Sequence, residues 1–175
     1  MPTAYTTKKT MPQIIISSDN TDQVLAEVKR KAQAALEACG NQAVSHAKQN
    51  LTAAGRRDTG NLINSMTHKV QKDACYVGTD KDYAIYNEVG TGKFAADGNG
   101  RKGWWVYVVG EGAKKNRTTG KIYSQEEAAK IVARLRAKGL DARMTEGMKP
   151  THFLKNAIQD HVDEYKSIIE NELKK

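Results

Sequence analysis

The residues whose types could do chemistry are few, and their spacing completes no reactive site. Asp58 and Glu88 could act as a general acid and a general base, but Asp58 precedes a Thr-Gly pair, where its side chain is expected to cap a turn. Residues 98–103 spell G-x-G-x-x-G, yet a dinucleotide site needs a strand before this motif and a helix after it. Here a strand-forming tryptophan pair follows. The sequence therefore predicts a loop at 98–103 and no nucleotide site.

Histidines and cysteines also lack a spacing that supports metal or thiol chemistry. No histidine has a short metal-binding spacing or a carboxylate three or four residues away that completes a known site; they are His46, His68, His152 and His161. His46 falls on a predicted long helix and is interpreted as a surface or subunit contact. Cys39 and Cys75 are interpreted as small core residues of a protein from a reducing compartment. We therefore expect no metal, no cofactor and no enzymatic activity.

The composition fits one basic domain with an insertion. The chain has 175 residues, with 28 Lys and Arg against 20 Asp and Glu, a net charge of +8. No apolar run approaches the roughly 18 to 20 residues of a membrane helix. The N-terminus has no apolar signal core. We expect neither membrane contact nor secretion.

Apolar spacing predicts an α+β fold. Apolar residues three or four positions apart predict a helix from about 21 to 54. At roughly 30 residues it is long for so small a domain, so its ends should overhang and pack on a neighbouring subunit. Strand-like stretches at 66–71, 74–78 and 83–89 predict an antiparallel meander. A single helix after Pro150, with Thr151 as its N-cap, completes a fold in which a long N-terminal helix and a C-terminal helix pack on a small antiparallel sheet.

The chain is expected to divide into an arm, a core and an inserted unit. Residues 1–19 form a flexible arm with a short strand at 13–17 as its candidate element. The core comprises residues 20–92 and 148–175. Residues 93–147 form an inserted, basic β-loop-α-β unit, whose helix begins at a capping box made by Ser124 and Glu127.

The inserted unit is the most basic part of the chain. Residues 101–149 hold twelve Lys or Arg and five Asp or Glu, which is seven of the eight surplus positive charges. Basic side chains can hold phosphates while aromatic ones stack bases. However, alternate residues of a strand point to opposite faces, so some aromatics must enter the unit's own core. Both readings stay open, and DNA is a candidate partner; the contact residues would be Arg101, Lys102, Trp104, Trp105, Lys114, Lys115 and Arg117.

Three segments, in order, carry a resemblance to a known family. The first is Arg-Asp-Thr-Gly-Asn-Leu at 57–62 with Ser-Met at 65–66. The second is Tyr-Val-Gly-Thr at 76–79 followed by Tyr-Ala-Ile-Tyr-Asn-Glu-Val-Gly-Thr-Gly at 83–92. The third is Pro-Thr-His-Phe-Leu-Lys-Asn-Ala at 150–157. Together they resemble the tail-component family of tailed bacteriophages and prophages, which comprises head–tail joining and tail-completion (neck) proteins. The family usually has only a short arm where this chain has the inserted unit.

The resemblance implies a structural virion protein that joins head and tail, or completes the tail, by assembling into a ring of six. It implies other neck and tail proteins as partners, and a location in the virion and, during assembly, in the host cytoplasm. Tyr83 and Tyr86 are expected on opposite faces of a strand, one packed on the long helix and the other reaching a neighbour. Glu88 and the glycines after it are expected to form an interface hinge. The expected turn or subunit-contact residues are Asp58, Thr59, Gly60, Tyr83, Tyr86, Glu88, Gly90, Thr91 and Phe153.

Overall fold

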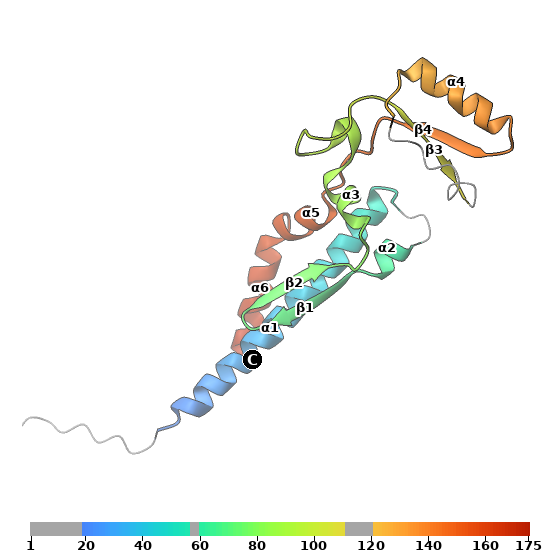
Figure 1. The fold of residues 1–175 in the computed structure, drawn as a ribbon. Coiled ribbons are helices and arrows are strands. Elements are labelled where there is room, and N and C mark those ends of the chain that lie inside the picture. The colour runs from blue at the N-terminus through green and yellow to red at the C-terminus, as the bar shows by residue number, and fades with distance from the viewer. Residues whose placement is uncertain (1–18, 57–59, 111–120) are drawn as a thin grey trace, which may run out of the picture.

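One long helix, α1 (Thr21–Ala53), is the axis on which most of the protein is built. The computed structural model describes residues 19–56, 60–110 and 121–175, so the expected strand at 13–17 lies outside the described residues. At 33 residues and about 1.5 Å per residue, α1 is roughly 50 Å long. Figure 1 shows the C-terminal helices and a β-hairpin lying along its middle, while its N-terminal turns extend past them. The predicted α+β fold is confirmed, and the N-terminal end of this helix overhangs as predicted, but its C-terminal end does not, because Leu51 is buried in the core.

A β-hairpin packs on α1. Strands β1 (Thr67–Gln71) and β2 (Ala74–Gly78) pair antiparallel, with Thr67 opposite Gly78. The two residues between them form the predicted turn, in which Lys72 has a positive φ of 55°. A short helix, α2 (Asn61–Asn64), precedes the hairpin.

The third strand predicted for the meander is wrong. Residues 84–89 form helix α3 (Ala84–Val89), so the sheet of the core has two strands. Tyrosine and β-branched residues favour a strand here, but tertiary contacts decide otherwise. Ala84 is buried in the main core and Glu88, one helical turn later, reaches the C-terminal segment. A helix brings these two positions within about 6 Å along one face, whereas a strand would separate them by about 13 Å.

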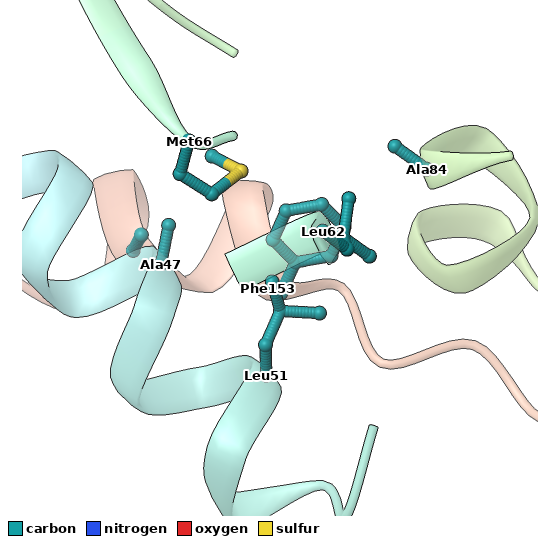
Figure 2. Close-up of a cluster of buried hydrophobic side chains, with 7 residues drawn as sticks. Ala47, Leu51, Leu62, Met66, Ala84 and Phe153 are labelled. Carbon is teal, nitrogen blue, oxygen red and sulfur yellow. The ribbon is translucent and has the colours of Figure 1, made fainter. Parts of the chain in front are cut away.

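The main core lies where α1, α2, α3 and α5 meet (Figure 2). Phe153 and Leu51 are fully buried there, and Figure 2 shows the Phe153 ring beside Leu62. The cluster consists of Ala47, Leu51, Leu62, Met66, Ala84, Phe153 and Ala157. These residues come from both parts of the chain that flank the inserted unit, which explains how the two parts form one body.

The C-terminal helix is divided, contrary to the prediction of one helix capped by Thr151. Helix α5 (Phe153–Gln159) begins after His152, which is left-handed at φ 50°, and α6 (Val162–Lys174) begins after His161. The division lets α5 pack into the core while α6 follows α1. The Tyr165 hydroxyl donates to the Ala157 carbonyl at 2.6 Å, which satisfies one acceptor near the break.

The inserted unit (93–147) has the predicted β-loop-α-β order and a core of its own. Strands β3 (Trp105–Val109) and β4 (Asp141–Thr145) pair antiparallel beneath helix α4 (Gln125–Arg136), and a 3-10 turn, η1 (Gly92–Phe94), precedes them. The predicted capping box of Ser124 and Glu127 is confirmed. The buried cluster consists of Val106, Val108, Ala128, Val132 and Ala142. In Figure 1 the unit lies beyond α3, apart from the hairpin and α6.

Candidate assembly surfaces

The chain enters and leaves the inserted unit along one hydrogen-bonded seam, which we define as residues 87–93 paired with 146–152. The backbone N–H of Thr91 donates to the Met148 carbonyl at 2.8 Å. The Met148 N–H donates in return to the backbone carbonyl of Thr91 at 3.2 Å and to its hydroxyl at 3.0 Å. Thr91, expected at a subunit contact, therefore has its polar groups used within the chain.

Glycines allow the two sides of the seam to approach. Gly90 and Gly92 have positive φ angles of 76° and 61°. A Cβ on Gly92 would overlap the carbonyl oxygen of Glu146, and one on Gly147 would overlap that of Thr91. The stretch expected to be a flexible hinge is thus a tightly packed crossing of two backbones.

Glu88 holds the same seam from its other end. Its carboxylate accepts hydrogen bonds from the backbone N–H groups of Leu154 at 2.8 Å and Lys155 at 3.1 Å. The Thr151 hydroxyl donates to the Asn87 carbonyl at 2.9 Å. Glu88 therefore caps the first turn of α5, where an anion also meets the positive end of the helix dipole.

Tyr83 is the N-cap of α3 and Tyr86 lies within this helix, so the two are not on opposite faces of a strand. Tyr83 is 44% exposed and Tyr86 is 55% exposed. Ile85 and Val89 are also exposed, so one side of α3 is apolar and uncovered. We call Tyr83, Ile85, Tyr86 and Val89 the α3 surface.

A second apolar surface lies on the N-terminal turns of α1. Val24, Leu25 and Val28 are each about half exposed, at 51%, 50% and 52%. Val24 and Val28 line a groove together with Leu173 of α6, whose carbonyl accepts a hydrogen bond from Lys31 at 3.4 Å. We call Val24, Leu25 and Val28 the α1 surface. It is the part of α1 that extends past α6 in Figure 1.

Of the remaining expected turn or contact residues, one lies in a turn, one is buried and two are not described. Gly60 has a φ of 80° and is the N-cap of α2, a turn role as predicted. Phe153 is fully buried in the main core, so its expected role as a subunit contact is wrong. Asp58 and Thr59 lie outside the described residues.

Of the candidate nucleic-acid residues, the described ones split between surface and core. Trp104 pairs with Tyr123 through two backbone hydrogen bonds, and both pack on the core of the inserted unit. The Arg101 guanidinium lies 5.1 Å from the centre of the Trp105 ring, a cation–π contact that occupies this aromatic face. Lys102 is exposed. Lys114, Lys115 and Arg117 lie outside the described residues.

One cluster of polar side chains was not predicted from the sequence. His46, interpreted as a surface or subunit contact, is only 8% exposed and contacts Glu164 and His161 of the C-terminal segment. The spacing of His161 and Glu164, three residues apart at the start of α6, was the available signal. His46 could not be joined to them from sequence because 115 positions separate it from His161.

Comparisons of the chain with protein-family models, with curated proteins and with solved structures found no match. In the described part of the chain, no helix combines the length and the apolar character that crossing a membrane requires. The three motifs are therefore the basis of the family resemblance.

Proposed function

We propose that the chain is a structural protein of a tailed phage or prophage particle that joins head and tail, or completes the tail, by assembling into a ring of six. The three motifs in order support this role. The proposed partners are further copies of the chain and other neck and tail proteins. The proposed locations are the virion and, during assembly, the host cytoplasm.

The α1 surface is the observation that carries the ring. A closed ring joins one patch of a subunit to a different patch of the next subunit. The subunit offers two separate apolar surfaces, on the first turns of α1 and on α3. Burying apolar area yields about 25 cal/mol per Å², so half-exposed Val24, Leu25 and Val28 would gain from a neighbour. The proposed ring contact places the α1 surface of one copy on the α3 surface of the next.

Light scattering after size-exclusion chromatography tests this contact. The wild-type chain is expected to elute as a closed oligomer, and Leu25→Glu is expected to reduce it to a monomer. Ala26→Glu is the matched control, because it introduces the same charge on the same exposed turn but on the opposite side of α1 from Val24 and Val28. A wild-type monomer at every concentration, or equal loss of the oligomer in both variants, would contradict the ring.

Nucleic-acid binding by the inserted unit is the alternative, and its surplus of positive charge favours it. Binding driven by phosphates weakens steeply from roughly 50 to 200 mM salt, whereas a ring closed by apolar surface persists over this range. Fluorescence anisotropy with labelled DNA would show salt-sensitive binding that Lys102→Ala weakens if the alternative holds. Neighbouring genes for portal and tail-tube proteins would support the virion role independently.

A further inference from the structure

Two histidines and a glutamate converge where α6 begins against α1. The Nε2 atom of His46 lies 2.9 Å from Oε2 of Glu164, and Nδ1 of His161 lies 3.3 Å from the same oxygen. The two imidazole rings stack with their centres 3.4 Å apart and their planes 8° from parallel. Both rings therefore present a nitrogen toward one carboxylate oxygen.

These atoms have the identity and spacing of a metal-ligand set. The three ligand atoms all lie within 4.8 Å of one another. Zn²⁺ binds imidazole nitrogen and carboxylate oxygen at about 2.0–2.2 Å, and a tetrahedral arrangement then separates ligand atoms by roughly 3.4 Å. Because the two rings are nearly parallel, their nitrogen lone pairs do not yet converge, and the imidazoles must tilt apart substantially before both nitrogens can bind one ion. Two imidazoles and a carboxylate suit borderline ions better than Mg²⁺ or Ca²⁺, which prefer oxygen ligands.

The carboxylate is held in place by a neighbour that is not itself a ligand. Gln42, one turn before His46 on α1, donates from Nε2 to Oε1 of Glu164 at 2.7 Å. This leaves Oε2 turned toward the two imidazoles. Hydrogen bonds of this kind orient ligands in metal sites, and their loss typically weakens metal binding 10- to 100-fold.

A cation can reach this position from solvent, and the Glu164 carboxylate provides a negative charge for it to neutralise. The side chains of His161 and Glu164 are 31% and 37% exposed, so an ion can enter from solvent. Within the described part of the chain, Glu164 forms ion pairs with His46 and His161 and with no lysine or arginine. Three protein ligands leave a fourth position for a water molecule.

An ion bound at this position would strengthen the packing of α6 on α1. Helix α6 packs along α1, but none of its residues is fully buried, so a bond at its first turn would add to this contact. An ion bound to His46 of α1 and to the first turn of α6 would join the two helices. We propose that His46, His161 and Glu164 bind a four-coordinate transition-metal ion of the Zn²⁺ class that anchors α6 to α1. This site is independent of the proposed ring.

Titration of the full-length, untagged chain with Zn²⁺ and with Co²⁺ tests the site. After treatment with a chelator, the wild-type chain is expected to bind one ion per chain by calorimetry. Co²⁺ is expected to give the visible absorption of a four-coordinate complex. In the presence of Zn²⁺, amide hydrogen exchange in α6 should slow, and the melting temperature should rise.

Ligand variants and matched controls decide the assignment. His161→Asn and Glu164→Gln change partly exposed side chains and are expected to weaken Zn²⁺ binding more than 100-fold, while Gln42→Ala weakens it about tenfold. His152→Asn is the control, since asparagine tolerates the left-handed backbone found there, and it should bind like the wild type. Absence of binding in the wild type, binding unchanged in Glu164→Gln, or equal loss in His152→Asn would each overturn the proposal.

Discussion

The carboxylate of Glu88 lies 2.8 Å from the backbone nitrogen of Leu154, so α3 caps the helix that opens the C-terminal part of the core. The two residues lie 66 positions apart, with the whole inserted unit between them. The Lys155 N–H also donates to Glu88. Glu88 therefore joins the part of the core that precedes the inserted unit to the part that follows it.

Replacing Glu88 should therefore loosen α5 more than any other helix. Glu88→Ala leaves two backbone donors without their carboxylate and is expected to lower the free energy of unfolding by about 2 kcal/mol. Glu88→Gln retains one acceptor oxygen and should cost less. Denaturant unfolding gives the loss, and hydrogen exchange locates it. Equal protection of α5 in the wild type and Glu88→Ala would contradict this role.

Local signals account for what the sequence predicts correctly. The long apolar stripe, the turn at residues 72–73 and the Ser124–Glu127 pair each act within a few residues, and α1, the hairpin and the capping box follow from them. Helix α3 does not follow from local signals, because its conformation depends on burying Ala84 and on the hydrogen bonds between Glu88 and α5. The cluster of His46 and Glu164 depends likewise on how α6 packs against α1.

The seam predicts a sharp contrast between two glycines of similar backbone conformation. Gly92 and Gly98 have φ angles of 61° and 71°, but a Cβ at Gly92 would overlap the Glu146 carbonyl, whereas nothing lies within 4 Å of one at Gly98. Gly92→Ala is expected to cost about 3 kcal/mol, from strain and overlap together. Gly98→Ala should cost about 1 kcal/mol, from strain alone. Thermal melts of the two variants check the difference, and equal losses would refute the close approach.

Phe153 and Tyr86 should separate folding from assembly. Phe153 is fully buried, so Phe153→Ala is expected to cost about 4 kcal/mol. Tyr86 is 55% exposed, so Tyr86→Ser should change the stability of the diluted, monomeric chain by no more than about 0.5 kcal/mol. If α3 forms part of a ring contact, Tyr86→Ser reduces the oligomer in light scattering while circular dichroism stays unchanged. A large loss of stability in Tyr86→Ser would show that this side chain supports the fold instead.

The capping box should make helix α4 sensitive to acid. The Ser124 backbone N–H, and then its hydroxyl, donate to the Glu127 carboxylate and lower the pKa of that carboxyl below its usual value of 4.5. A carboxyl with a lowered pKa in the folded state stabilises that state above about pH 4.5, and the contribution is lost as pH falls through the folded-state pKa. At neutral pH, Glu127→Gln should therefore speed hydrogen exchange in α4 relative to the wild type.

The same comparison at lower pH completes the test. As pH falls below the folded-state pKa of Glu127 its carboxyl becomes protonated, so the difference between the wild type and Glu127→Gln should shrink toward zero. Glu126→Gln is the matched control, because it removes a charge from the same first turn but not the partner of Ser124. Ser124→Ala removes the other half of the box and should cost about 1 kcal/mol at neutral pH. A wild-type advantage over Glu127→Gln that is the same at neutral pH and at a pH low enough to protonate the carboxyl would exclude the carboxylate as its source.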